Sequence, residues 1–320
     1  MRTFRVGMVL IAISVSATVF AAGGAEEGDA TRLVLGTGGT SGPYYAIGGA
    51  LKGVFEASDM IQSLTVESTG ASVMNINNID QGLNQVALVM SDVAYDASVG
   101  RGRFEGRQQE ITAIAGLHPN VVQVVATADS GIREIADMAG RRIGVGQVGS
   151  GVEQSAQKVL AAAGLTYDDF SQVGNTGYAD SVQAMKNGTL DAAFFTSGIP
   201  NANIIDVMQT MDVVFVPITG EVAANLLAEY PFYLNHVIPA NDAVQYDLAS
   251  PVETVSIRNL LIVDPGTPPE LAREITARFH EYLGSDTLTL EVLKQFDRDT
   301  MHEGLVVGLH PGAAQFYAER

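Results

Sequence analysis

The feature that most constrains the fold is a succession of apolar and amphipathic segments that occurs twice along the chain. The expected strands of the first series are 32–35, 63–67 and 86–90, and its expected helices are 43–57 and 72–81. The expected strands of the second series are 142–146, 170–173 and 192–195, and its expected helices are 152–163 and 178–186. Strands that alternate with helices are typical of α/β proteins. The chain is therefore expected to form two α/β lobes of similar plan.

The two series are most alike over SVMNINNIDQGLNQVALVMSD (72–92) and SVQAMKNGTLDAAFFTSG (181–198). Each segment runs through a helix, a glycine turn, a polar residue and an apolar strand, and ends on hydroxyl side chains. Open α/β sheets bind ligands at the carboxyl ends of their strands. Each lobe is expected to present three loops there, and the cleft between the lobes is the natural binding site.

A glycine-rich loop precedes a helix in each series, at 36–42 and at 147–151. The first N–H groups of a helix lack intrahelical partners and carry a positive partial charge, so they bind anions without arginine. Thr40, Ser41 and Ser150 add hydroxyl groups, and Glu153 could receive an ammonium group. Two opposed anion sites across one cleft suit a small dicarboxylate or an amino acid. The alternative is that these hydroxyl residues only cap helices.

Several other chemistries do not fit the spacing of the residues. The first loop has Ser41 where a dinucleotide motif needs its third glycine, and no Lys-Ser or Lys-Thr pair completes a P-loop. Ser155 and Lys158 match S-x-x-K, but the companion elements of penicillin-recognising enzymes are missing. The histidines have no zinc-binding spacing, and Asp168-Asp169 is more typical of a helix start than of a calcium site. No metal, cofactor or catalytic residue is expected.

Composition sets the compartment and excludes some partners. The 320 residues include 36 acidic and 18 basic side chains and no cysteine. Residues 1–21 are expected to be a cleaved signal peptide, with a membrane anchor as the alternative, and residues 22–31 a disordered leader. The excess of acidic residues disfavours nucleic acid as a partner. Without cysteine the protein cannot be lipidated at an N-terminal cysteine, so a soluble periplasmic protein is expected.

The lobe borders follow from the same pattern. The apolar segments 121–126 and 256–263 are expected to be paired strands through which the chain enters and leaves the second lobe. Lobe 1 is therefore expected to comprise 32–120 and 264–320, and lobe 2 to comprise 121–263. The hinge is expected near 118–122 and 263–268.

Motifs along nearly the whole chain carry a family resemblance. They include LGTGGTSGPYYAIGGAL, VESTGASVMN, ALVMSDVAYDA, RRIGVGQVGSGVEQSA, DAAFFTSGIP, SIRNLLIV and LHPGAAQFY. The chain resembles the TAXI family of extracytoplasmic solute-binding proteins, which serve tripartite ATP-independent periplasmic (TRAP) transporters. The resemblance implies an α/β, type II periplasmic-binding-protein fold, with two lobes and a ligand cleft between them. It also implies capture of a small organic acid for a permease driven by an ion gradient.

Ligand-facing loops of the family correspond here to 37–44, 70–72, 91–92, 147–153 and 196–197. The tyrosines at 44, 45, 95, 178 and 233 could line the cleft, and Tyr44 and Tyr233 are preferred. The expected ligand-binding residues are Thr40, Ser41, Tyr44, Ser72, Ser91, Asp92, Gln147, Val148, Gly149, Ser150, Gly151, Glu153, Thr196, Ser197 and Tyr233. Pro43 and Val152 depart from the usual family pattern, since Pro43 lacks a backbone donor and Val152 lacks a hydroxyl group.

The expected function is therefore a monomeric receptor that hands a small organic acid to a TRAP-type permease. Glutamate, 2-oxoglutarate, another dicarboxylate and a sulfonate all remain open as ligands. A ligand-sensing partner of a membrane kinase would use the same cleft. A hydrolase on the same fold is a further alternative, but no histidine lies in any of the six expected loops.

Overall fold

The structure is a computed structural model that describes residues 31–241 and 246–320. The expected signal peptide and residues 22–30 of the expected leader lie outside the described residues. Thr31, which was expected to end the leader, instead begins the first strand. Within the described residues, no helix combines the length and the apolar character that a membrane crossing requires.

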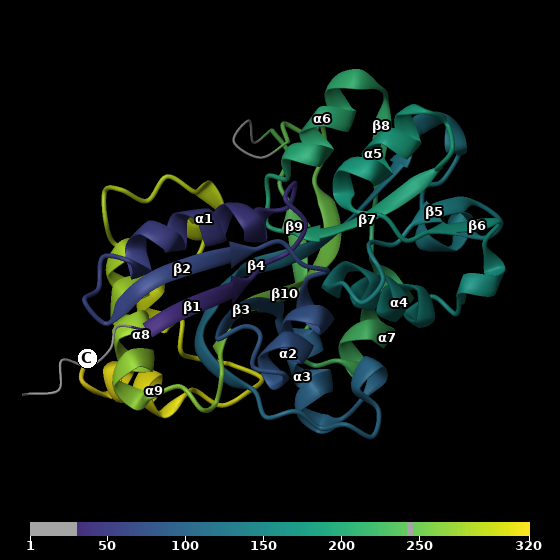
Figure 1. Ribbon diagram of the computed structural model, residues 1–320. Helices are drawn as coiled ribbons and strands as arrows, with labels where there is room; N and C mark the ends of the chain where they lie inside the picture. Colours follow the sequence, from purple (N-terminus) through teal and green to yellow (C-terminus); the bar gives the residue numbers. More distant parts are fainter. Residues whose placement is uncertain (1–30, 242–245) are drawn as a thin grey trace, which may run out of the picture.

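The first series of elements forms one half of the molecule, at the left of Figure 1. It contains β1 (Thr31–Gly36), α1 (Pro43–Phe55), β2 (Ile61–Glu67), α2 (Ser72–Asp80), β3 (Val86–Met90) and α3 (Ser91–Val99). Strand β1 pairs in parallel with β2 and β3. Pro43 stands at the first position of α1, where its fixed φ is compatible with the helix and its missing N–H removes no internal bond.

The second series forms the other half. It contains β5 (Arg142–Gly144), α4 (Gly151–Ala162), β6 (Gln172–Gly174), α5 (Tyr178–Lys186), β7 (Ala192–Ser197), α6 (Ala202–Thr210), β8 (Val213–Val216), α7 (Gly220–Glu229) and β9 (Leu234–Ile238). Strand β5 pairs in parallel with β6 and β7, as β1 does with β2 and β3. The two halves therefore repeat a parallel plan. Strand β5 is shorter than expected, and Gly146 turns just beyond it with a positive φ of 89°.

Two long antiparallel strands, β4 (Thr112–Thr127) and β10 (Val252–Val263), join the halves. The strand order of the curled sheet is β2-β1-β3-β10-β4-β7-β5-β6, with β8 beside β4 and β9 beside β10. Both strands extend beyond the expected segments. Residues Asn259–Val263 of β10 pair with β3 of the first half, although the sequence pattern assigned them to the second lobe.

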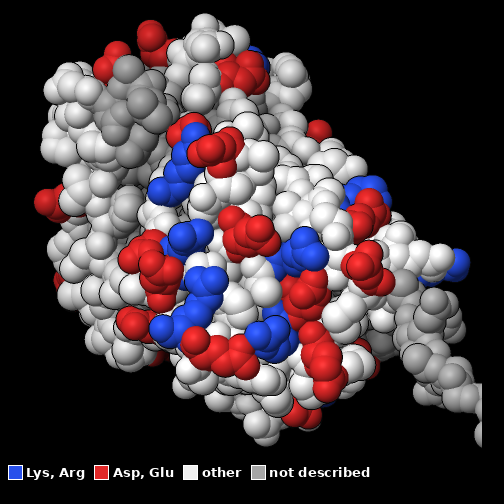
Figure 2. Space-filling model, turned by 90° about the vertical axis from the view of Figure 1, so that its left-hand side faces the viewer, with Lys and Arg blue, Asp and Glu red and all other residues white. Residues whose placement is uncertain are grey.

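The chain ends on the first half. Helix α8 (Pro269–Leu283) packs against α1 and α9 (Pro311–Ala318), and the Tyr317 hydroxyl donates to the carbonyl of Ile114 in β4. The short 3-10 helices are η1 (Gly102–Phe104), η2 (Ala128–Ser130), η3 (Ile135–Met138), η4 (Tyr167–Asp169), η5 (Glu291–Lys294) and η6 (Arg298–Thr300). Figure 2 shows the face at this end of the molecule, where acidic and basic side chains are interspersed.

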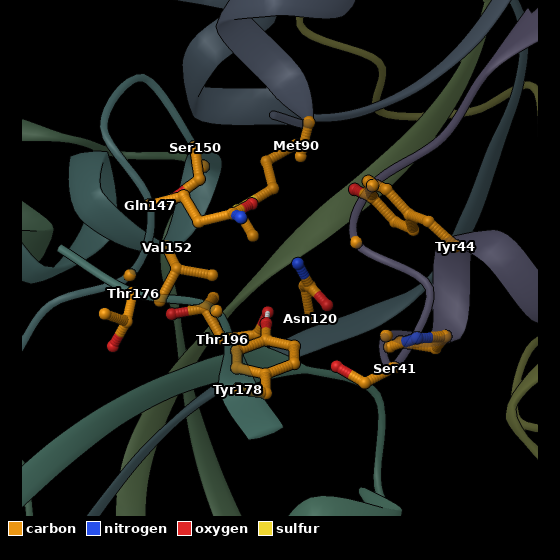
Figure 3. A pocket seen from close by; sticks show the side chains of 18 residues that line it. Ser41, Tyr44, Met90, Asn120, Gln147, Ser150, Val152, Thr176, Tyr178 and Thr196 are labelled. Atoms are coloured by element: carbon orange, nitrogen blue, oxygen red, sulfur yellow. Dashed lines mark hydrogen bonds between the residues drawn. The ribbon is translucent and has the colours of Figure 1, made fainter. Parts of the chain in front are cut away.

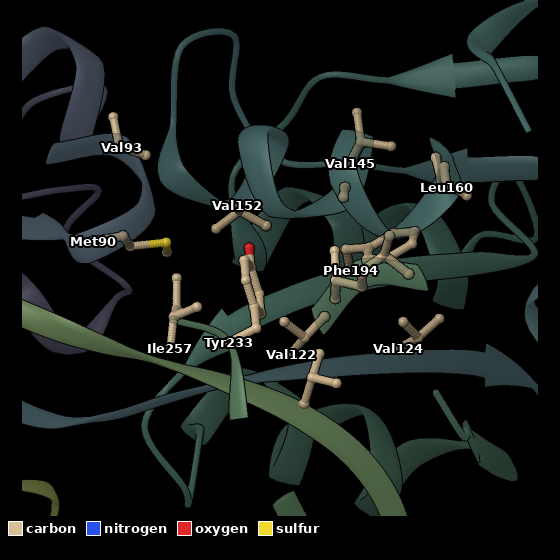
Figure 4. Close-up of a cluster of buried hydrophobic side chains, with 14 of the residues drawn as sticks. Met90, Val93, Val122, Val124, Val145, Val152, Leu160, Phe194, Tyr233 and Ile257 are labelled. Atoms are coloured by element: carbon tan, nitrogen blue, oxygen red, sulfur yellow. The ribbon is translucent and has the colours of Figure 1, made fainter. Parts of the chain in front are cut away.

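The hydrophobic core is continuous between the halves. One cluster fills the first half around Leu35 and Phe279, and another fills part of the second half around Phe195. A third cluster contains residues of both halves, and Figure 4 shows Met90 and Val93 of the first half facing Val152 and Tyr233 of the second. The halves are therefore in apolar contact and do not meet only at the joining strands.

Candidate ligand-binding site

A cavity of about 70 Å³ lies between the two halves (Figure 3). The first half contributes Gly38, Gly39, Ser41, Gly42, Pro43, Tyr44, Ala71 and Met90 to its lining. The second half contributes Gly146, Gln147, Ser150, Gly151, Val152, Thr176, Gly177, Tyr178 and Thr196. Asn120 lines it from β4, one of the two joining strands. The cavity is thus bounded by both halves and by the connection between them.

Four helices begin at this cavity: α1 and α2 from the first half, and α4 and α5 from the second. Gly42, Ala71 and Gly177 precede α1, α2 and α5 and give no side-chain cap, whereas the Ser150 hydroxyl accepts from Glu153 N at the start of α4. First-turn amides of uncapped helices are donors with positive partial charge. The cavity therefore faces helix starts with positive partial charge on two opposite sides.

Some buried polar side chains of the cavity lining have hydrogen-bond partners among the described residues of the protein, and one does not. The Tyr178 hydroxyl donates to the carbonyl of Thr196 at 2.7 Å, and the Tyr44 hydroxyl donates to Asn259 Oδ1. Asn120 is only 1% exposed, and neither its Oδ1 nor its Nδ2 has a partner in the described part of the chain. Figure 3 shows its amide directed into the cavity.

The cavity is electrically neutral at its lining. Of the residues that the structure describes, no Lys, Arg, His, Asp or Glu lines it. Burial raises the pKa of Tyr44 well above its ordinary value and also raises the pKa of Tyr178, so both stay protonated. Burial lowers the pKa of nearby His118 to about 3, so this ring is neutral. Across 31–241 and 246–320, no cluster of three or more potential metal-ligating side chains is found.

The two carboxylates that the sequence placed at the site are held by basic side chains. Asp92 Oδ2 accepts from Lys158 Nζ at 2.8 Å and from the Tyr233 hydroxyl at 3.0 Å. Glu153 Oε2 accepts from Arg103 at 2.8 Å and from the Gly149 amide at 2.7 Å. Both carboxylates are buried outside the cavity lining. In this structure Glu153 is therefore placed against Arg103, whereas the sequence analysis considered that it could receive a ligand's ammonium group.

Part of the expected set lines the cavity: Ser41, Tyr44, Gln147, Ser150, Gly151 and Thr196. Thr40 and Val148 are exposed outside the lining, and Gly149 lies beyond it in the same loop. The remaining expected residues are buried outside the lining: Ser72, Ser91, Asp92, Glu153, Ser197 and Tyr233. Several of these make internal hydrogen bonds, as when Ser72 Oγ accepts from Met90 N.

The structure adds Met90, Asn120 and Thr176, which the sequence analysis did not name as candidates. It also adds Val152, which lies in the expected loop 147–153, and Tyr178, which was named as a possible cleft residue but not preferred. The signal for Thr176 and Tyr178 was present, because GNTG at 174–177 is a glycine-containing loop before a helix, like the two loops that were chosen. Asn120 carried no such signal, since it lies inside a long buried strand.

The S-x-x-K pair does not form a nucleophile and base here. The Ser155 hydroxyl lies 2.6 Å from Thr196 Oγ1, whereas Lys158 Nζ is bonded to Asp92 and Asp96. A serine nucleophile needs a base within hydrogen-bond reach. The two side chains are each bound to other partners.

Two α/β halves, joined by two long strands and enclosing a cavity at their helix starts, define the two-lobe fold of the periplasmic binding proteins. A solved structure from Bordetella bronchiseptica RB50 has 16% identity over 90% of this chain and 82% of its own, with a TM-score of 0.54. PhnD1 from Prochlorococcus marinus, in complex with methylphosphonate, has 7% identity over 83% of this chain and 89% of its own, with a TM-score of 0.53. The chain belongs to the NMT1-like family, whose model matches residues 35–320.

Proposed function

We propose that this protein is an extracytoplasmic solute-binding receptor that captures a small organic acid and delivers it to a TRAP-type permease. The observation that carries the proposal is the convergence of four helix starts, two from each half, on a cavity with an uncharged lining. Such a lining suits an anion that is held by backbone amides and hydroxyl groups. The assignment includes no catalytic step.

The helix starts alone do not supply the expected affinity. A micromolar dissociation constant corresponds to about 8 kcal/mol. Each helix terminus contributes up to about 1 kcal/mol at an exposed site. Directed hydrogen bonds and the removal of water from the closed cavity supply most of the remainder.

Binding is coupled to contact between the lobes. We assign 32–120 and 264–320 to lobe 1 and 121–263 to lobe 2. Because Asn259–Val263 pair with β3, a strand of lobe 1, the point where the chain returns to lobe 1 is better placed near 258. The lobes touch beside the cavity, where Asn203 Nδ2 donates to the carbonyl of Ser41 at 2.9 Å and Val73 N donates to the carbonyl of Gly149 at 3.2 Å. A ligand that bridges the lobes stabilises this closed arrangement relative to an open one.

The proposals of a TRAP-type partner and of a periplasmic location depend on the sequence alone. The ordered motifs from LGTGGTSGPYYAIGGAL to LHPGAAQFY support a TRAP-type partner, and the basic and apolar residues of 1–21 support export to the periplasm. We propose that the receptor acts there as a monomer.

The binding step is tested by titrating the purified protein with a panel of organic acids in a calorimeter. A ligand of the native state is expected to raise the melting temperature as well. Ser41→Ala and Ser150→Ala are expected to weaken the binding of the best acid several-fold, because both residues line the cavity. Ser171→Ala is the matched control, since Ser171 is exposed and lies outside the lining.

Two results would count against the proposal at different levels. If no acid binds, or if both variants bind the best acid as the wild type does, the site is wrong. If binding is intact but the acid is not accumulated in vesicles that contain a TRAP permease together with this receptor, the partner is wrong.

A further inference from the structure

Asn120 is the side chain that gives information about the ligand. It lies in the middle of β4, opposite Ile257 of β10, where the chain passes between the lobes. It is 1% exposed and lines the cavity, yet its Oδ1 and Nδ2 have no partner among the residues described. A buried amide without hydrogen bonds is costly, and such groups are rare in native structures. A bound ligand is the simplest source of the missing partners.

The chemistry of an amide restricts what that ligand presents. Oδ1 needs a donor, and Nδ2 needs an acceptor. A carboxylate supplies only acceptors, so it would leave Oδ1 unsatisfied. A hydroxyl group next to a carboxylate supplies a donor and an acceptor at neighbouring positions. A 2-hydroxycarboxylate is therefore complementary to the Asn120 amide.

An ammonium group would also donate to Oδ1, but the cavity offers it no charge partner. No carboxylate lines the cavity within the described ranges, and the converging helix starts are positive. The nearby carboxylates of Asp92 and Glu153 are bonded to Lys158 and Arg103. A buried cation without a counter-charge is strongly disfavoured. The site therefore favours the hydroxyl over the ammonium group.

The volume limits the size of the ligand. One water-sized sphere needs about 10–15 Å³ of cavity volume. If each sphere stands for one non-hydrogen atom, the cavity of about 70 Å³ holds roughly five to seven such atoms. Met90, Val152 and the ring of Tyr178 add apolar surface to the lining. An acid of three or four carbons fits this space, whereas glutamate and 2-oxoglutarate are larger.

Resting on the proposed function, we propose that the cavity takes a small 2-hydroxycarboxylate of three or four carbons and that Asn120 is the residue that selects it. The Asn120 Nδ2 donates to the carboxylate, and its Oδ1 accepts from the hydroxyl group. The helix starts on both sides of the cavity hold the remaining carboxylate charge.

A set of ligands that differ in polar groups and in size tests this assignment. Both enantiomers of lactate are titrated beside alanine, which has an ammonium group in place of the hydroxyl, and propionate, which has neither. Glutamate, 2-oxoglutarate, malate and methanesulfonate complete the set. One enantiomer of lactate is expected to bind at least tenfold tighter than alanine and propionate.

The Asn120→Leu variant separates recognition from folding. Leucine has a similar size but no polar atoms, so this variant is expected to bind lactate and propionate with similar, weak affinity. Its melting temperature without ligand is expected to be no lower than that of the wild type, because no intramolecular hydrogen bond is lost.

Asn201→Leu is the matched control. Asn201 is also buried, at 3% exposed, but its Nδ2 donates to Ser197 Oγ and its Oδ1 accepts from Asn203 N at the start of α6. This variant is expected to lower the melting temperature and to keep the preference for lactate over propionate.

The outcomes distinguish this inference from the function on which it rests. If alanine, propionate, methanesulfonate, glutamate or 2-oxoglutarate binds as tightly as lactate, or if Asn120→Leu keeps the preference, the inference is overturned while the receptor function stands. If no member of the set binds, both are overturned.

Discussion

Behind the cavity, His118, Asn259 and Tyr44 form a buried hydrogen-bonded row. Asn259 Nδ2 lies 2.9 Å from His118 Nε2, and Asn259 Oδ1 accepts from the Tyr44 hydroxyl. An amide nitrogen can only donate, so His118 Nε2 accepts and the ring proton is assigned to Nδ1. This row fixes the ring of Tyr44 at the cavity and requires a neutral histidine.

His118 is expected to make the free energy of unfolding decrease as the pH is lowered below 6.5. Burial lowers its pKa from 6.5 to about 3, so between these values the unfolded chain binds a proton that the native protein does not. The contribution of the neutral His118 ring to the free energy of unfolding is fully present above pH 6.5 and is lost as the pH falls toward 3. At pH 5 the loss is about 2 kcal/mol. Urea unfolding at pH 7 and pH 5 measures it.

His118→Gln keeps an acceptor for Asn259 but cannot titrate. The decrease in unfolding free energy from pH 7 to pH 5 should be smaller in this variant by about 2 kcal/mol. Equal decreases in variant and wild type would show that His118 is not the group responsible.

At the residue scale the sequence predicted side chains at helix starts and missed those that depend on distant contacts. Ser41 and Ser150 could be found because the loop-to-helix pattern is local. Asp92 and Glu153 were assigned to the ligand because their basic partners lie 66 and 50 residues away along the chain. Asn120 could not be selected, because only the fold shows that a strand residue faces a cavity.

Among the secondary-structure elements, the approach of α4 to the first lobe depends on a glycine. A Cβ atom at Gly151 would lie 2.4 Å from Met90 Sδ and 2.8 Å from Ser72 Oγ. Gly151→Ala is therefore expected to push the start of α4 away from α2 and the end of β3, and to weaken ligand binding at least tenfold in a calorimetric titration.

Gly53→Ala is the matched control for this change. Nothing lies within 4 Å of the Cβ that it would add in helix α1. It should leave affinity unchanged and stabilise the protein by about 0.5–1 kcal/mol, as alanine does in a helix interior. Unchanged affinity in Gly151→Ala would mean that the close contact is not needed for binding.

The elements of the two repeated series were largely predictable. The boundaries of β3 and α5 agree with the expected ranges, and the other predicted helices and strands of the two series shift by one to a few residues, whereas α3, α6, β8, α7 and β9 were not predicted. The joining strands were predicted too short, because strands buried on both faces lack the alternation that marks strand ends. Their pairing with strands of both lobes is a tertiary feature that no local pattern specifies.

For the whole molecule, one buried lysine joins the halves. Lys158 of α4 lies 2.8 Å from Asp92 and 2.9 Å from Asp96, both in α3. Burial alone would lower the pKa of Lys158, but the two carboxylates more than offset this and raise it. Lys158→Met leaves both carboxylates without their cation and is expected to cost about 3–5 kcal/mol of unfolding free energy.

Lys186→Met is the comparison, because the Lys186–Asp206 pair is largely exposed on the Asp206 side and joins elements of one half only. Its effect in the same urea titration should stay below about 1 kcal/mol. Similar losses in the two variants would argue against a special role for the pair between the halves.

The neutral lining of the cavity has a consequence for the cargo. With Tyr44 and Tyr178 protonated, His118 uncharged and no ionisable group on the lining within the described ranges, no wall residue changes its protonation near neutral pH. Under the function proposed above, a captured acid would enter and leave as the same anion that is dissolved outside. Any proton that its passage through the membrane consumes would have to be gathered by the permease.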